Sequence, residues 1–519
     1  MSSSTSALMT TSRNVTPAQI FPGRGIGFLT LGASLHNTLT RLKANPHTYP
    51  SIDLSYSSSN PIHAPVLITL PENGLRLRFD GPDQRLRLIE VLDFTKISLT
   101  YKSHDVLKST KSTDQSPQQG PSFRHIYNRM FGPSYPGEFF PSSCGSLHGT
   151  YVLSYPGVAF SFPLLQSAWS EQCDFVSLMS SSAASSATSM AVFQGSSWLD
   201  GRSNLYTRQP QYPRSTALSG KNRESVADEI EEVKVHGAGR VEFLRRAGSS
   251  FCITLSETTP QDLVSEFGPP DAIYRKNDRR ISIHGDQSLG NAKLRHTSPS
   301  FPGCAADPTD IDPLSETSVT DESDGENSPT FQRDCASLAT ECFYNYFDHG
   351  FDALISHPTV SGPPFPASSH PEASVISSGP QLTVTKLLLH GNVPGSYPFN
   401  RHRRSRWSLN MTSSMEPLTS ETPYDQISNE LKRIWKGSHS SPSEEMALQR
   451  GMVLNRGWGD SPGSSVELLG GWEDNTTNKH LTGSETDGGQ TLGNTELFGF
   501  PGLVFEVLKN RAISCLTVY

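Results

Sequence analysis

A short helical pattern followed by a strand that opens on glycine recurs along this chain, and it constrains the fold more than any other feature. TPQDLVSEFGPP at 259–270 shows the helix completely, since Thr259 can cap its first turn and Gly268 with two prolines can end it. Leu263, Val264 and Phe267 form one apolar stripe between these signals. A helix this short is marginal in water, so we expect it to lie on a sheet.

Three other segments predict the same kind of helix, at 34–44, 122–131 and 423–436. Each of the four is followed by a glycine that opens a strand with alternating apolar residues: GLRLRF at 74–79, GVAFSF at 157–162, HGFDALI at 349–355 and GLVFEV at 502–507. Returning strands follow at LRLIEVLDF, LTVTKLLLH and AISCLTVY, and strands at VLITL, YVLSY and ISIHG precede the hairpins.

These patterns predict an α+β fold, made of repeated units of a short helix packed on a small antiparallel β-sheet. A unit of roughly 60 to 70 residues is marginal alone, so adjacent units are expected to share sheets or bury faces against each other. The predicted organisation is a disordered N-terminus at 1–22 and then unit 1 at 23–110, unit 2 at 120–256, unit 3 at 257–410 and unit 4 at 415–519.

Long stretches of biased composition interrupt the units, and only 34% of the 519 residues are hydrophobic, with 38 Pro and 41 Gly. Such stretches bury too little apolar surface to offset the entropy of ordering, so we expect disorder. They lie at about 165–225 in unit 2, 286–335 and 357–378 in unit 3, and 457–495 in unit 4. The acidic run at 320–329 fits a solvated segment or a phosphorylatable tail.

Charge and hydropathy exclude several classes of protein. A net charge of −8 argues against nucleic acid as the main partner, because that binding needs a dominant basic surface. No apolar run approaches the roughly 18 residues that span a bilayer, and the first residues lack the apolar core of a signal peptide. The seven cysteines show no paired spacing, which predicts reduced thiols. Together these features predict a soluble intracellular protein without a transmembrane segment.

The motifs typical of catalysis occur only in the wrong context. GDSPG around Ser461 matches a nucleophile elbow, but a Gly-rich loop replaces the strand and helix that the elbow needs. GRGIG at 23–27 lacks the preceding strand and third glycine of a dinucleotide site, and no HExxH motif occurs. The sequence therefore predicts no catalytic residues, cofactor or metal, with a hydrolase or transferase of unfamiliar fold as the alternative.

A basic cluster stands out in this acidic chain. FNRHRRSRW at 399–407 places Arg401, Arg403, Arg404 and Arg406 around His402 and next to Trp407. Arginines bind phosphate through paired hydrogen bonds, and an adjacent aromatic can sit at a membrane interface. We predict that the cluster projects from a sheet edge and binds an anionic lipid headgroup; the alternative is a solvated loop that balances nearby acid.

An aromatic cluster follows at CFYNYFDHGF, 342–351. Alternating Phe343, Tyr344, Tyr346 and Phe347 fit the core side of a strand, and otherwise a patch that binds a protein partner.

Several of these segments together resemble the phagophore assembly factor family. The resemblance rests on GPSYPGEF at 132–139, YPGVAFSFPL at 155–164, EFGPPDAIYRK at 266–276, CFYNYFDHGFDALI at 342–355 and LHGNVPGSYPFN at 389–400. It covers most of the chain outside the biased stretches, which look like additions to a shorter family core.

The resemblance implies a non-enzymatic adaptor in autophagy. Members of the family form a complex with a β-propeller protein and are recruited from the cytoplasm to the forming autophagosome, where phosphoinositide binding is invoked. An older label implies traffic from the trans-Golgi network to the plasma membrane, which is the alternative interaction role. No catalytic residues of the family exist to carry over, and the assignment of lipid binding to the basic cluster rests on its residues alone.

We predict that neither 170–222 nor 286–333 packs, and deletion of 286–333 tests this for the second stretch. Its composition cannot form a core, so the shortened chain should unfold within a few degrees of the wild-type thermal midpoint. Differential scanning calorimetry measures the midpoint, and a large fall or a loss of solubility would show that the stretch packs.

Overall fold

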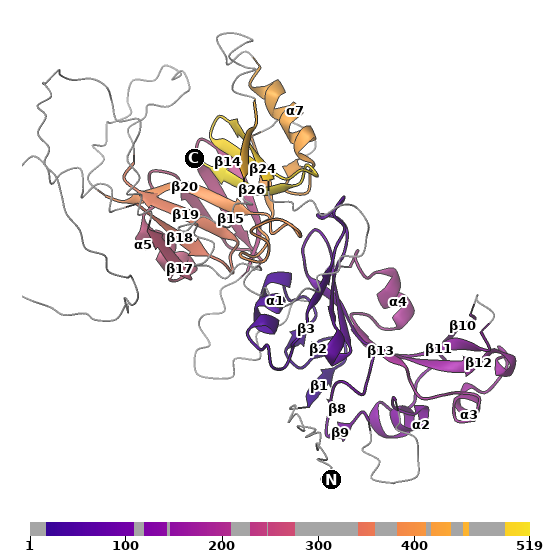
Figure 1. Ribbon diagram of the computed structural model, residues 1–519. Helices are drawn as coiled ribbons and strands as arrows, with labels where there is room; N and C mark the ends of the chain where they lie inside the picture. The colour runs from indigo at the N-terminus through magenta and orange to yellow at the C-terminus, as the bar shows by residue number, and fades with distance from the viewer. Residues whose placement is uncertain are drawn as a thin grey trace, which may run out of the picture.

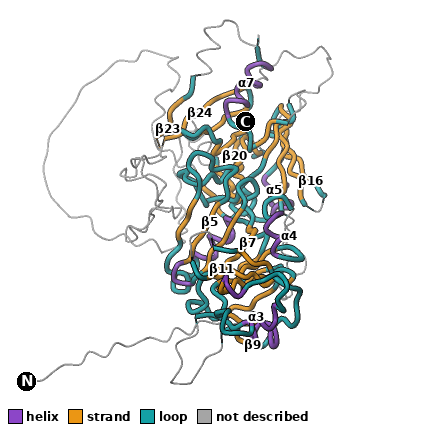
Figure 2. Tube along the Cα trace, turned by 90° about the vertical axis from the view of Figure 1, so that its right-hand side faces the viewer, coloured by secondary structure: helices purple, strands orange, loops and turns teal. Residues whose placement is uncertain are grey.

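The computed structural model describes residues 17–107, 119–142, 146–208, 229–246, 248–275, 341–358, 381–411, 417–436, 450–455 and 494–519. These residues form mostly antiparallel sheet with few helices, arranged as an N-terminal half (17–208) and a C-terminal half (229–519) (Figure 1). Figure 2 shows the two halves end to end. Of the helices in the described part of the chain, none combines the length and apolar character needed to cross a bilayer.

The N-terminal half begins with β1 (Ala18–Phe21), β2 (Gly25–Ile26), β3 (Leu29–Thr30), α1 (Leu35–Lys43), β4 (Asp53–Ser55), β5 (Val66–Leu70), η1 (Pro71–Asn73), β6 (Leu75–Phe79) and β7 (Leu86–Val91). It continues with β8 (Leu99–Tyr101), β9 (His104–Asp105), α2 (Phe123–His125), the π-helical η2 (Ile126–Met130), β10 (Glu138–Phe140), β11 (His148–Tyr155), β12 (Val158–Leu165), η3 (Gln166–Ala168), α3 (Phe175–Met179), β13 (Ser189–Phe193) and α4 (Trp198–Ser203).

The C-terminal half contains β14 (Ile230–Gly237), β15 (Arg240–Arg245), β16 (Ser250–Thr254), α5 (Pro260–Phe267), β17 (Ala272–Arg275), β18 (Cys342–Tyr346), β19 (Phe351–Ser356) and β20 (Thr383–His390). It ends with β21 (Trp407–Leu409), β22 (Leu418–Thr419), α7 (Tyr424–Ile434), β23 (Met452–Asn455), β24 (Asn494–Phe500), β25 (Leu503–Val507) and β26 (Ile513–Val518).

The two halves share one strand plan. Each has a five-stranded sheet, ordered β3-β2-β1-β8-β9 or β16-β15-β14-β21-β22, with one parallel pair at β1–β8 or β14–β21. Each also has an eight-stranded antiparallel sheet, ordered β10-β11-β12-β13-β7-β6-β5-β4 or β23-β24-β25-β26-β20-β19-β18-β17. Each eight-stranded sheet consists of two four-stranded meanders joined through their last strands, so the sheets are larger than the small units predicted from the sequence.

The order of elements recurs four times, because α1, α2, α5 and α7 each precede a four-stranded meander in the chain. The four glycine-led strands predicted from the sequence are β6, β12, β19 and β25, and each is the third strand of its meander. The apolar stripe of α1 lies in the core of the N-terminal half, and those of α5 and α7 lie in the core of the C-terminal half. That each helix covers the sheet of its own unit stays a prediction.

Two predictions about individual segments are wrong. Residues 166–208 were expected within a disordered insert at 165–225, yet they include α3, α4 and β13, which pairs with both β7 and β12. The prediction failed because serine and alanine dominate the composition of this segment, and its apolar run around Val192 and Phe193 is short. Both of these side chains are fully buried. The helix expected at 122–131 has only a short α-helical turn before η2. The stretch at 286–335, residues 359–378, most of 457–495 and the strand ISIHG lie outside the described residues.

A joint of polar and apolar contacts connects the halves. Gln84 Nε2 donates to the Asn392 backbone oxygen, and Asn392 Nδ2 donates to Gln84 Oε1, both at 2.8 Å and both buried. Phe399 enters the core of the N-terminal half. A separate apolar cluster joins Ile62 to Val393, Leu508 and Ala512. The loop at 391–406, which runs from β20 to β21, therefore holds the halves together.

The glycines that precede the third strands provide a matched test of backbone geometry. Gly350 has φ +84° and Gly502 has φ +75°, conformations that cost an L-residue about 1–2 kcal/mol. A Cβ on Gly350 would lie 2.5 Å from the Arg403 carbonyl oxygen in the joint, whereas the nearest atom to a Cβ on Gly502 is 3.5 Å away.

Gly350→Ala should therefore reduce the free energy of unfolding more than Gly502→Ala, by about 1 kcal/mol or more, because only the first substitution adds a collision. Chemical denaturation of the two variants measures the difference. Equal losses would contradict the close approach of β19 to the joint.

Candidate functional site

The basic cluster lies in the joint and does not project from a sheet edge, so that expectation is wrong. The side chains of His402 and Arg404 are each 2% exposed and that of Arg403 is 11% exposed, while Arg406 keeps 40% of its side chain in solvent. Trp407 is buried in β21, within the core of the C-terminal half. Arg401 is half-buried, and its backbone oxygen contacts His36 Nε2 of the other half at 3.2 Å.

The arginines are buried because distant parts of the chain supply acceptors for them. Arg404 donates from Nε to the Pro82 backbone oxygen at 2.8 Å and from Nη1 to the Gly391 backbone oxygen at 2.7 Å. Arg406 donates from Nε to Glu421 Oε1 at 2.9 Å and from Nη1 to Asp83 of the N-terminal half. Binding of a lipid headgroup by this cluster stays a prediction, and in this arrangement it would have to reach side chains that already hold the joint.

Glu229 pairs with three arginines, one of which belongs to the basic cluster. Its Oε2 lies 2.9 Å from Nη2 of Arg85, 2.9 Å from Nη2 of Arg246 and 3.6 Å from Nη2 of Arg403. Burial alone would raise the pKa of this carboxyl, but the three guanidinium groups outweigh it and lower the pKa to about 2. Burial and the neighbouring Arg85 lower the pKa of Arg403 to about 10. The positively charged guanidinium groups of Arg85, Arg246 and Arg403 therefore lie close together around Glu229.

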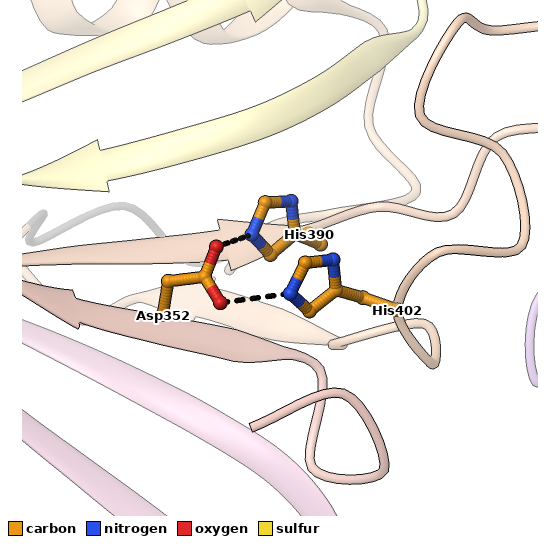
Figure 3. Close-up of side chains that lie close together, drawn as sticks. All are labelled: Asp352, His390 and His402. Atoms are coloured by element: carbon orange, nitrogen blue, oxygen red, sulfur yellow. Dashed lines mark hydrogen bonds and ion pairs between the residues drawn. The ribbon is translucent and has the colours of Figure 1, made fainter. Parts of the chain in front are cut away.

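A second cluster is made of Asp352, His390 and His402, and His402 belongs to the loop at 391–406 (Figure 3). Asp352 Oδ2 is 2.9 Å from His390 Nε2, and Asp352 Oδ1 is 2.8 Å from His402 Nε2. Asn345 Nδ2 donates to the same Oδ1 at 2.8 Å, and the two imidazole rings stack with centroids 3.7 Å apart. The polar side chains of Asn345, Asp352 and His390 thus come from β18, β19 and β20, and they lie against His402 of the loop at 391–406.

The two histidines hold their protons differently. Burial opposes a charge on His390, but the Asp352 carboxylate outweighs burial and raises the pKa of His390 to about 10. Burial and the charged His390 lower the pKa of His402 to about 3. His402 Nδ1 has no hydrogen-bond partner among the described residues, so a second proton there would be a buried donor without an acceptor. The pKa of Asp352 is lowered, because the two imidazoles outweigh the burial that opposes its charge.

In this cluster, His390 is an imidazolium paired with the Asp352 carboxylate, and the neutral His402 is a second donor to the same carboxylate. Its three ligating atoms lie within 4.8 Å of one another, close enough for one metal ion to contact all three. As they stand, both Nε2 atoms donate to Asp352, and a metal would have to displace both hydrogen bonds and the proton of His390. The arrangement is better suited to anchoring the loop at 391–406 on the sheet.

The aromatic cluster is divided between core and surface. Tyr346 is 1% exposed and lies in the core of the C-terminal half, as expected for the inner side of a strand. Phe343 and Tyr344 on the same strand are half-buried. The half-buried ring of Phe347 packs edge-on against His402, with centroids 4.9 Å apart. Partner binding by these four residues stays a prediction. Ser461 lies outside the described residues.

Sequence reasoning missed half of the joint. Glu229 and Arg246 belong to no motif, and Asp352 and His390 look like ordinary residues of strands. The only available signal was a short polar turn, GPDQR at 81–85, whose residues pair with the basic loop more than 300 positions later.

Comparisons with known proteins cover almost the whole chain. The profile of the family described as phagosome assembly factor 1 matches residues 25–301 and 327–519. A PHAF1 protein of Arabidopsis thaliana is 22% identical over 524 residues, covering 98% of this chain and 94% of the relative. A PHAF1 protein of Drosophila melanogaster is 22% identical over 508 residues, covering 94% and 90%. A PHAF1 protein of Caenorhabditis elegans is 30% identical over 133 residues, covering 26% and 28%. No solved structure matches this chain.

The pKa of His402 generates a prediction about acid stability. Its pKa is lowered to about 3 in the folded state from 6.5, so unfolding takes up a proton between these values and the free energy of unfolding falls as the pH falls through this window. His402→Gln keeps a donor for Asp352 without this titration, and its stability should fall less steeply between about pH 6.5 and pH 4.

His47→Gln is the control, because His47 is exposed. Denaturant unfolding of wild type and both variants over this pH range measures the slopes. If the His402→Gln slope equals that of wild type while the control also matches wild type, His402 does not stay neutral in the fold.

Proposed function

Because this chain belongs to the phagosome assembly factor 1 family, we propose that it acts in autophagy as a non-enzymatic adaptor recruited to the surface of the phagophore membrane. Membership in the family supports an autophagy-related role. The observation that carries the proposal is the extent of the match, which includes both halves and the loop at 391–406 that joins them.

The joint supports the adaptor mechanism. An adaptor must hold two attachments in a defined geometry, because a second attachment gains effective concentration only when the geometry permits both. The buried Gln84–Asn392 amide pair and the ion pair of Arg406 with Asp83 hold the halves in one relative position. In the proposed role, a protein partner, expected to be a β-propeller protein from the family resemblance, supplies one attachment and a phosphoinositide surface the other.

The outer strands of the C-terminal eight-stranded sheet offer a place for the protein partner. Ile273 and Tyr274 of β17 are 55% and 44% exposed, and Met452 and Val453 of β23 are 64% and 63% exposed, at the two edges of the same sheet. An exposed apolar edge strand can accept a strand from another protein, and leaving it bare promotes aggregation. We propose the β23 edge as the partner-binding surface.

Two other roles are distinguishable from this one. A factor for traffic from the trans-Golgi network would also bind proteins and membranes, but its loss would slow secretion in fed cells. A hydrolase or transferase of unfamiliar fold that works through a serine nucleophile would depend on Ser461, the residue that the sequence offers. The same cells can test all three roles.

In cells that lack this protein, wild type and Ser461→Ala should both restore starvation-induced autophagic flux, because no catalytic nucleophile is needed. The double variant Met452→Lys, Val453→Lys should lose the co-purifying partner and restore flux poorly, since two charges at a strand edge oppose strand addition. Degradation of an autophagy reporter and affinity purification with mass spectrometry give the two readouts.

Tyr135→Lys is the matched control, because Tyr135 is 90% exposed in the other half. Loss of flux in Ser461→Ala at normal protein level would revive the enzymatic role. Normal flux with slowed secretion in the cells that lack the protein would favour the trans-Golgi role. An unchanged set of co-purifying proteins in the double variant would exclude the β23 edge.

A further inference from the structure

A small cavity lies in the joint, and five arginines line it. Its volume is about 30 Å³, above the 10–15 Å³ or so that one ordered water needs. The lining arginines are Arg85, Arg246, Arg403, Arg404 and Arg406. Arg85 comes from the N-terminal half and the other four from the C-terminal half, so a molecule in this cavity would contact both halves.

The charges around the cavity favour an anion. Five arginines line the cavity, against two carboxylates, Asp83 and Glu231. Glu229 and Glu421 pair with these arginines from beside the cavity, and Asp348 and Glu232 lie near Arg403 and Arg406. The lowered pKa of the Arg403 guanidinium, caused by burial and the nearby Arg85, agrees with an excess of positive charge. Arg406 is partly exposed and Glu231 is exposed, so the cavity has polar residues in contact with solvent along one side.

Arg404 supplies an independent observation that points to a ligand. Its side chain is 2% exposed, and its Nε and Nη1 atoms already donate to backbone oxygens. Its Nη2 atom is buried without a hydrogen-bond partner in the described part of the chain, and the nearest carboxylate oxygen, on Glu421, is 3.6 Å away. An ion pair of this length leaves the buried N–H group without a well-formed hydrogen bond, so this atom can take an acceptor from outside the chain.

We propose that the joint cavity binds a phosphate group, with Arg404 Nη2 as a direct donor and both halves contributing arginines. A phosphate offers several oxygens in a tetrahedron and can accept from several planar guanidinium groups at once, which a carboxylate or a halide cannot match. Water would satisfy Arg404 Nη2 but would leave the excess charge in place. Bound phosphate would also strengthen the joint, because it contacts both halves only when they are assembled.

The phosphate group has two sources, a soluble phosphoester or the headgroup of a phosphoinositide. The soluble form is independent of the proposed adaptor role. The lipid form deepens that role and rests on it, because it makes this cavity the membrane attachment.

The first experiment uses the full chain and inorganic phosphate. Phosphate should raise the thermal midpoint of wild type above that in sodium chloride of matched ionic strength, and isothermal titration should show saturable binding. Arg404→Gln should weaken that binding about 10- to 100-fold, the loss expected for one charge-assisted hydrogen bond. Arg433→Gln, on an exposed part of α7, should bind as wild type does. No effect of phosphate beyond that of chloride would overturn the proposal and leave water in the cavity.

Hydrogen exchange on wild type keeps the proposal testable if Arg404→Gln fails to fold. Phosphate should slow exchange in both the turn at 81–85 and the loop at 391–406, because the ligand contacts both. Slowed exchange in neither segment, or only in segments remote from the joint, would overturn the site.

The second experiment separates the two sources. Soluble inositol trisphosphate and phosphatidylcholine vesicles carrying a phosphatidylinositol phosphate are offered to wild type, Arg404→Gln and Arg433→Gln. Vesicle binding that Arg404→Gln alone loses supports the lipid form, whereas binding of only the soluble compound supports the soluble form and overturns the lipid form. Binding of neither, with phosphate also failing, overturns the site. Flux in cells is scored separately, so normal flux with Arg404→Gln contradicts the lipid form without touching the adaptor proposal.

Discussion

The pairing of last strands, β7 with β13 and β20 with β26, is the constraint on which the rest of the structure depends. Met190 pairs with Val91 and Leu387 pairs with Val518, so each pair of four-stranded meanders becomes one continuous sheet. A meander with one short helix is too small to bury a sufficient core, and fusion roughly doubles the sheet that the helices can cover. It also places the turn at 81–85 and the loop at 391–406 beside the fused strands, where they can meet.

The joint between the halves is built from charges because those two segments are polar. Buried ion pairs seldom add much stability, since desolvation offsets their attraction, but they penalise any arrangement that leaves one charge alone. The ion pairs Arg85–Glu229 and Asp83–Arg406 cross between the halves, so a shift of one half would separate Arg85 and Asp83 from these partners. The joint therefore fixes the relative position of the two halves more than it stabilises their association. A fixed position is what an adaptor and a cavity shared by both halves need.

The candidate site was half predictable. Four arginines within six residues are visible in the sequence, and their affinity for phosphate follows from guanidinium chemistry. Their burial was not predictable, because it depends on Asp83, Glu229 and Glu421, which are remote in sequence and carry no motif. The same holds for His402, whose pKa is lowered by burial, which includes packing against Phe347, and by the neighbouring His390. Neither cause can be inferred from the residues that flank His402 in the chain.

The resemblance to the family rested on particular segments of the sequence. Local periodicity was enough to predict the four glycine-led strands and the helices α1, α5 and α7, because side-chain alternation and helix signals act over a few residues. It failed for β13, whose few apolar residues are diluted by serine and alanine, since a strand in the middle of a sheet is stabilised by its neighbours on both sides. Only the tertiary structure decided which meanders fuse and which half supplies a carboxylate to which arginine. It also decided where a cavity remains. Those outcomes depend on contacts between residues as far apart as Asp83 and Arg406, and burial sets their strength by removing the water that would otherwise screen them.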